Sequence, residues 1–375
     1  MRRIPLLFGV LVAAATGCRT ATPRSDSESG DASCATGPEC LQLAARFHTA
    51  SGVAEDFVRA RTLYDKACRL GSALACTNLG FMYEKGEGGP VEWARANAFY
   101  EQGCALGDGR GCNNLGNDYA NGDGVARDWA RANVLYERGC ALGNAGGCLN
   151  LGESHRKGVG VAKNLERAVE LFEKACEMGH GIGCNNLGIA YESGMGVTQD
   201  LQRANALLEK GCALGEADPC RNLGLNYAEA RGVAEDWARA NALFSEACLR
   251  ADAFACNKLG SSIELGRGSE KDQQRANTLF GRACDLGAPS GCEKLADNLA
   301  HGNGGPPDPE SAKPLYDRAL TLLENGCSKR IPDACDMLAS MYENGSGRPR
   351  DASKAKELRR TACELRGRSD CTSKE

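Results

Sequence analysis

The chain has 375 residues, of which 42% are hydrophobic but only 6% aromatic, while Ala and Gly are abundant. This composition favours thin layers of closely packed helices over one large core. The formal net charge of −4 at pH 7, without a long basic or acidic block, gives no reason to expect a nucleic-acid partner.

The N-terminus has the features of an export signal. Two arginines precede an apolar run, residues 4–15, that is too short to span a bilayer as a permanent helix. The run ends in AATGC, which resembles a bacterial lipoprotein box. Residues 1–17 are therefore predicted to be a lipoprotein signal peptide and Cys18 to carry the lipid, with an ordinary cleaved signal peptide as the alternative. In lipoprotein sorting, an Asp directly after the lipid-bearing Cys retains the protein at the inner membrane. This chain has Arg19 at that position, which by analogy favours the outer membrane.

Residues 18–33 are predicted to be the lipidated cysteine and a disordered tether. After Cys18 this segment contains no Leu, Ile, Val or aromatic residue, so it has nothing to bury. Residues 34–371 are predicted to form a repeat array, and residues 372–375 a short tail.

Twenty of the 21 cysteines fall into ten neighbouring pairs. The pairs are Cys34/Cys40, Cys68/Cys76, Cys104/Cys112, Cys140/Cys148, Cys176/Cys184, Cys212/Cys220, Cys248/Cys256, Cys284/Cys292, Cys327/Cys335 and Cys363/Cys371. From Cys68 onward the two members are eight residues apart, and most pairs recur every 36 residues. Such a period predicts stacked supersecondary units.

The cysteine pairs are predicted to be disulfides. An exported chain meets an oxidising compartment, where an even cysteine count indicates a disulfide framework. Residues eight apart on one helix are about 12 Å apart, whereas a disulfide needs Cα atoms within roughly 7 Å. The chain must therefore reverse between the two cysteines, and glycines such as Gly107, three residues after Cys104, suit the left-handed end of a helix. Zinc ligation fits less well because structural zinc sites use closer spacing and four ligands.

One repeat unit reads CNNLGNDYANGDGVARDWARANVLYERGC, residues 112–140. Leu115 and Tyr119 share a face of a first helix, on which Gly116 allows close helix contact. The segment NGDGV ends that helix, and Asp128 is suited to cap a second one. The pattern predicts nine helix pairs.

One unit is 43 residues long instead of 36. Its seven extra residues are expected in a Pro-rich exposed loop, residues 302–314. The loop is either a contact site or a harmless insertion.

The CxxLGxxYxxGxGVxxDxxxAxxxxxxxC pattern resembles the Sel-one-like repeats, which are relatives of the TPR, and within them the secreted Helicobacter cysteine-rich proteins. The resemblance covers about residues 34–371. It implies an all-α fold, a right-handed αα superhelical solenoid with a concave groove lined by the first helices and one disulfide per repeat. It also implies either protein or peptide binding, or penicillin binding with slow β-lactamase activity.

The β-lactamase alternative finds little support in the sequence. Serine β-lactamases use S-x-x-K together with S-D-N and K-T-G. S-x-x-K occurs at Ser154–Lys157 and Ser353–Lys356, but S-D-N and K-T-G do not occur. The four histidines, His48, His155, His180 and His301, lie in separate units without metal-binding spacing, so no metal or other cofactor is expected. His155 adjoins Ser154, but neighbouring helix residues point about 100° apart, and His155 is interpreted as a replacement for the usual Tyr.

Repeated asparagines suggest a binding surface. An Asn precedes the first-helix Leu in five consecutive units, at Asn78, Asn114, Asn150, Asn186 and Asn222. One helical turn further, Asp118 and Asn226 are included in the predicted surface. Because Asn is both donor and acceptor, these side chains can hydrogen-bond an extended backbone. The alternative is that Asn solvates or caps the start of the first helix.

The sequence therefore predicts an exported, lipid-anchored envelope protein without catalytic activity. Its expected partner is a protein or peptide, or a peptidoglycan fragment, held in the groove. A slow β-lactam hydrolase remains the alternative.

Overall fold

The computed structural model describes residues 34–368 and Cys371, and these form 18 helices without a strand. The predicted leader of residues 1–17, the lipidation site Cys18, its tether and the tail of residues 372–375 lie outside the described residues. Within the described part of the chain, no helix has the length and apolar character needed to cross a membrane.

The helices form nine consecutive pairs, as predicted, and each first (A) helix packs against the following second (B) helix. The A helices are α1 (Gly37–His48), α3 (Ala73–Lys85), α5 (Gly109–Asn121), α7 (Ala145–Lys157), α9 (Gly181–Ser193), α11 (Ala217–Ala228), α13 (Ala253–Leu265), α15 (Pro289–His301) and α17 (Pro332–Asn344). The B helices are α2 (Phe57–Arg69), α4 (Trp93–Ala105), α6 (Trp129–Ala141), α8 (Leu165–Glu177), α10 (Leu201–Ala213), α12 (Trp237–Leu249), α14 (Gln273–Asp285), α16 (Pro309–Ser328) and α18 (Ala352–Leu365).

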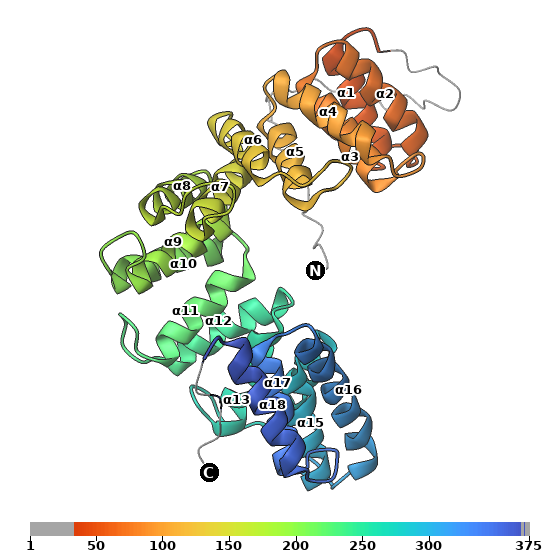
Figure 1. The fold of residues 1–375 in the computed structure, drawn as a ribbon. Coiled ribbons are helices and arrows are strands. Elements are labelled where there is room, and N and C mark those ends of the chain that lie inside the picture. The colour runs from red at the N-terminus through yellow and green to blue at the C-terminus, as the bar shows by residue number, and fades with distance from the viewer. Residues whose placement is uncertain (1–33, 369–370, 372–375) are drawn as a thin grey trace, which may run out of the picture.

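The pairs follow one another along a curved path from α1 to α18 (Figure 1). Beyond helices adjacent in sequence, the main contacts join the A helices of consecutive pairs, such as α5 with α7 and α9 with α11. Helices approach most closely on the inner side of a curved array, so the A helices form its inner face. The predicted all-α solenoid is confirmed.

Local sequence signals set the helix boundaries. Before α6, the Asp128 carboxylate accepts a hydrogen bond from the backbone N–H of Arg131, as expected of an N-cap. The preceding helix α5 ends at Gly122, which has a φ of +87°. Two residues later, Gly124 lies so close to the previous pair that a Cβ on it would be 2.4 Å from the Cβ of Trp93. The turn between A and B helices therefore packs directly on the start of the preceding B helix.

All ten predicted cysteine pairs form disulfides, with Cα–Cα distances from 4.5 Å to 5.6 Å. Eight of these bridges join the end of a B helix to the start of the next A helix, as predicted. They are Cys68–Cys76, Cys104–Cys112, Cys140–Cys148, Cys176–Cys184, Cys212–Cys220, Cys248–Cys256, Cys284–Cys292 and Cys327–Cys335. The bridge Cys34–Cys40 ties the chain before α1 to that helix, and Cys363–Cys371 ties α18 to the chain after it. Every connection between successive pairs is thus covalently closed.

The prediction that the long unit expands its loop is wrong. The turn before α16 is as long as the turn before α14, but α16 has 20 residues where α14 has 13. Asp308 caps the helix and Pro309 occupies its first turn, where proline is favoured. Seven residues make about two helical turns, so the insertion lengthens α16 while keeping the same face toward the core.

Candidate functional site

The five predicted asparagines lie on the inner face, one on each of α3, α5, α7, α9 and α11, and all are half-buried. The amide N–H of Asn150 donates to Oδ1 of Asn113, at 2.9 Å, on the preceding A helix. Asn222 donates in the same way to Asn185, at 2.8 Å. The ladder therefore ties consecutive A helices together, and Asn150 also donates to Oδ1 of Asn117, at 3.2 Å.

At the start of the array, tyrosines of the B helices are buried against the A helices. Tyr100 donates its hydroxyl to the Glu84 carboxylate of α3, at 2.7 Å, and the Tyr64 hydroxyl lies 3.4 Å from Nδ1 of His48 on α1. Burial raises the pKa of Tyr64 to about 12, so its hydroxyl stays protonated at neutral pH and remains a donor. Tyr64 and Tyr100 are 1% and 0% exposed, so they join the A and B helices and are not part of the inner face.

Asp118 and Asn226 do not lie on this surface, and their prediction as binding residues is wrong. They are only 3% and 2% exposed. Asn226 donates to Oδ1 of Asn205 on the B helix of its neighbour, at 2.8 Å. A residue four positions after the ladder asparagine faces the interior between A and B helices, which explains the burial.

The disulfide cysteines do not take part in the inner face either, because the second cysteine of each bridge between pairs is completely buried. The exposed fraction is 0% at Cys76, Cys112, Cys148, Cys184, Cys220, Cys256, Cys292 and Cys335. The first turn of each A helix packs its cysteine into the junction with the preceding B helix, where the partner sulfur lies. These predicted residues therefore hold the framework and offer no surface to a ligand.

A second set of asparagines, which the sequence analysis missed, ties the pairs together from the B helices. Each donates its amide N–H to a backbone carbonyl in the turn of the next pair, at 2.7–3.0 Å. They are Asn97, Asn133, Asn205, Asn241 and Asn277. The recurring triplet Arg-Ala-Asn near the start of the B helix is the sequence signal for them.

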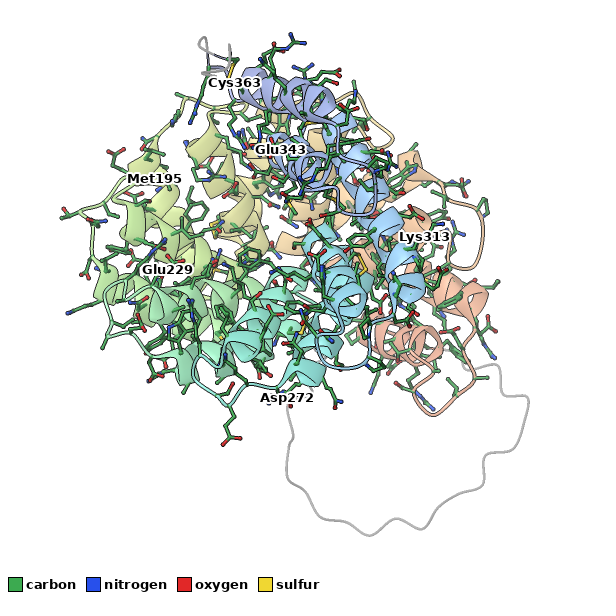
Figure 2. All side chains as sticks on the ribbon, turned by 90° about the horizontal axis from the view of Figure 1, so that it is seen from below. Met195, Glu229, Asp272, Lys313, Glu343 and Cys363 are labelled. Carbon is green, nitrogen blue, oxygen red and sulfur yellow. A yellow bond between two sulfur atoms is a disulfide. The ribbon has the colours of Figure 1, made fainter. Side chains whose placement is uncertain are left out.

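This second set is interrupted at α8, where Val169 takes the position of the asparagine. A pocket of about 170 Å³ lies there between α7, α8 and α9. Val169 and Phe172 line its interior together with Ala190. Met195, labelled in Figure 2, lies in the turn after α9 and completes the apolar wall.

The mouth of the pocket is charged. Arg156 donates to both carboxylate oxygens of Glu153, at 3.0 and 2.8 Å, and the ammonium of Lys157 lies 2.7 Å from the same carboxylate. Burial opposes ionisation of Glu153, but hydrogen bonds from these two cations hold its pKa below the ordinary value. Asn186 also donates to Glu153, at 3.1 Å, so the mouth belongs to the asparagine ladder.

The S-x-x-K serines are engaged elsewhere. Ser154 is buried and donates to the backbone carbonyl of Asn150, at 3.0 Å. The hydroxyl of Ser353 bonds the carboxylate of Asp351, at 2.6 Å, at the start of α18. Neither hydrogen bond joins the serine to the lysine of its motif.

The histidines are likewise dispersed. His155 lies over the turn after α7, with Nδ1 3.4 Å from the carbonyl of Ala162, so it does not activate Ser154. Across the described residues, no group of three or more His, Cys, Asp or Glu side chains is arranged to hold a metal ion.

The comparisons with known proteins give a consistent family match. The profile described as Sel1 repeat matches eight segments that cover more than half of the chain. They are residues 40–72, 73–108, 109–144, 145–180, 181–216, 253–287, 289–322 and 332–366. No curated protein matches the sequence significantly.

Solved structures with similar folds include a protective antigen of uropathogenic Escherichia coli with an SLR fold. It is 22% identical, the match covers 88% of this chain and 79% of that one, and the TM-score is 0.56. A Sel1 repeat protein from Oxalobacter formigenes is 24% identical, covering 65% of this chain and 99% of that one, with a TM-score of 0.60. Cysteine rich protein B of Helicobacter pylori is 34% identical, covering 36% of this chain and 96% of its own, with a TM-score of 0.31. The first two likenesses agree with the all-α solenoid.

Proposed function

Because the chain belongs to the Sel1 repeat family, whose repeats form scaffolds for protein–protein interaction, we propose that its inner face binds an extended peptide segment of another protein. The observation that carries this proposal is the ladder of half-buried asparagines, one on each of five consecutive A helices. An extended backbone alternates donors and acceptors, and an asparagine amide can pair with either. For Asn150, Asn186 and Asn222 the peptide would take the place of the present side-chain contacts of the amide N–H groups. Disulfides at every connection reduce the ordering cost of binding because the surface is held in place beforehand.

We propose that the protein is located in the bacterial cell envelope. Ten disulfides persist in an oxidising compartment and not in a reducing cytosol. We further propose that Cys18 carries a lipid and attaches the array to the outer membrane, where an envelope protein or a peptidoglycan fragment is within reach.

Peptide capture tests the proposal. The oxidised protein is used to select from a phage-displayed dodecapeptide library, and selected peptides are measured against the Asn114→Ser, Asn150→Ser, Asn186→Ser triple variant. Serine keeps a short polar group but removes the paired donor and acceptor, so we expect binding to weaken at least tenfold. A matched control replaces Asn121 and Asn344, which are exposed at the ends of α5 and α17, by Ser. Equal binding by the triple variant and the control would refute the inner-face site.

The slow β-lactam hydrolase implied by the resemblance to cysteine-rich proteins gains no support from this geometry. Nitrocefin turnover by the oxidised protein, lost in Ser154→Ala or Ser353→Ala, would nevertheless establish it. We expect no turnover above that of the buffer.

A further inference from the structure

The pocket between α7, α8 and α9 lies where three residues in two consecutive repeats differ from their counterparts, two on α8 and one on α9. Val169 stands where α6 has Asn133, so the tie to the next turn is missing. Ala190 stands where α11 has Asn226, which removes the polar side chain that faces the B helix. Phe172 replaces Tyr136, whose hydroxyl donates to Asn117 at 2.9 Å. A polar contact between helices is thereby exchanged for an apolar hollow.

The hollow has the size and lining of a side-chain pocket. Its volume is about 170 Å³, and an apolar protein cavity of about 150 Å³ accepts benzene. Its walls include Leu165, Val169, Phe172, Ile189 and Met195. A leucine or phenylalanine side chain therefore fits it in both size and polarity.

The charged lining of the pocket is the ion pair of Arg156 with Glu153, and Lys157, outside the lining, places a second cation on the same carboxylate. Arg156 and Lys157 share the single carboxylate of Glu153. The Arg156 side chain lines the pocket and is 38% exposed, so its guanidinium can also reach a ligand. An internal residue of a peptide brings only neutral amides to this point, whereas a C-terminal residue brings a carboxylate, which arginine binds strongly.

We propose that this pocket binds the C-terminal residue of a peptide, with its apolar side chain among Val169, Phe172 and Ile189 and its α-carboxylate on Arg156. The inference rests on the proposed peptide-binding function. It adds the direction in which the peptide runs and the kind of residue at its C-terminus. The rest of the peptide then extends along the asparagine ladder from Asn186.

The probe is N-acetyl-leucine, which is the end of such a peptide without the remainder. The oxidised full chain is labelled with ¹³C at its Ile, Leu, Val and Met methyl groups and titrated by NMR. We expect saturable shifts of the Val169, Ile189 and Met195 methyls. N-acetyl-leucinamide, which lacks the charge, and N-acetyl-alanine, which lacks the side chain, are each expected to bind at least fivefold more weakly.

Two variants separate the parts of the pocket. The double variant Val169→Asn, Ala190→Asn introduces the asparagine hydrogen bond that Asn226 and Asn205 form one repeat later, so we expect the fold to be kept. The two amides would fill the pocket, so we expect binding to disappear. Arg156→Gln is expected to weaken N-acetyl-leucine binding at least fivefold but to leave N-acetyl-leucinamide unchanged. Val134→Asn, at an exposed valine one repeat earlier, is the matched control and should bind as the parent chain does.

The outcomes distinguish the pocket from the wider function. Absence of saturable shifts at the pocket methyls, or equal shifts in the Val169→Asn, Ala190→Asn chain, would overturn the pocket even if the phage selection yields peptides. Equal affinity for acid and amide would overturn the C-terminal assignment. Binding of N-acetyl-leucine without any selected peptide would support the pocket and refute the extended ladder site.

Discussion

At the scale of single residues, His180 is unfavourable at its position, and its replacement is expected to stabilise the fold. It occupies the N-cap of α9 without a side-chain cap hydrogen bond, whereas Asn144 at the same position before α7 accepts from the backbone N–H of Gly147 at 2.7 Å. The Nδ1 atom of His180 is buried without a hydrogen-bond partner among the described residues. We expect His180→Asn to raise the free energy of unfolding by about 1 kcal/mol, as N-cap exchanges do, measured by urea denaturation.

The same residue predicts a pH dependence. Burial lowers the pKa of His180, although the nearby Glu216 carboxylate opposes this. The unfolded chain therefore binds a proton that the folded chain resists, so the parent protein loses stability as the pH falls through about 6.5. The gain from His180→Asn should be larger at pH 5.5 than at pH 7.5. Equal gains at the two pH values would show that burial of this imidazole does not affect stability.

Two glycines test the close packing of the turns. Gly160 and Gly143 both have left-handed backbones, with φ of +69° and +83°. A Cβ on Gly160 would lie 2.6 Å from the backbone of Trp129, whereas a Cβ on Gly143 would meet nothing within 4 Å. Gly143→Ala should cost about 1 kcal/mol for the backbone alone, and Gly160→Ala should cost about 1–3 kcal/mol more because of the clash. Equal losses in thermal unfolding would mean that the turn can move away from Trp129.

At the scale of helices, each disulfide is expected to hold one junction between pairs. Replacing Cys140 and Cys148 by Ala opens a loop of this length, which is worth about 2.5 kcal/mol in the chain-entropy model. Hydrogen exchange should then accelerate in α6 and α7 more than in α15. The equivalent change at Cys34 and Cys40 is the control, because that bridge joins no two helices and should affect α1 alone. Uniform acceleration along the chain would show that the bridges act globally.

The helix pairs and their bridges were predictable because their signals are local. A cap such as Asp128, a terminal glycine such as Gly122 and cysteines eight residues apart each act within a short stretch of chain. The length of α16 is not evident from the sequence, because prolines there indicate a loop, whereas Pro309 lies in the first turn, where a helix accepts it.

The inward or outward direction of individual polar residues was less predictable. Asn133 bonds a carbonyl 26 residues away, that of Val159, and this contact exists only after two pairs have stacked. The burial of Asn226 depends in the same way on α10 lying across from it. The pocket could not be foreseen for this reason, because Val169 and Ala190 are ordinary residues in sequence and adjoin only in the fold.

At the scale of the whole molecule, the array has no single core, since its buried residues divide into several clusters along the chain. Stability in such an array is approximately a sum over pairs and their interfaces, so a broken interface weakens its neighbourhood first. The end pairs have one neighbour each and should open before the middle. Coupling between neighbouring pairs comes from their interfaces and from the connections, and each connection is closed by a disulfide.

Reduction should convert this chain from a rigid array into a loosely coupled one. Urea unfolding is followed by circular dichroism with and without a thiol reductant. We expect one transition for the oxidised chain, and for the reduced chain a lower midpoint and more than one transition. The reason is that each bridge restricts the unfolded state and contributes about 2.5 kcal/mol. Reoxidation should restore the midpoint, which distinguishes the loss of bridges from irreversible aggregation. A reduced chain with the oxidised midpoint would show that helix packing alone suffices, and the argument that the protein must work in an oxidising compartment would then lose its physical basis.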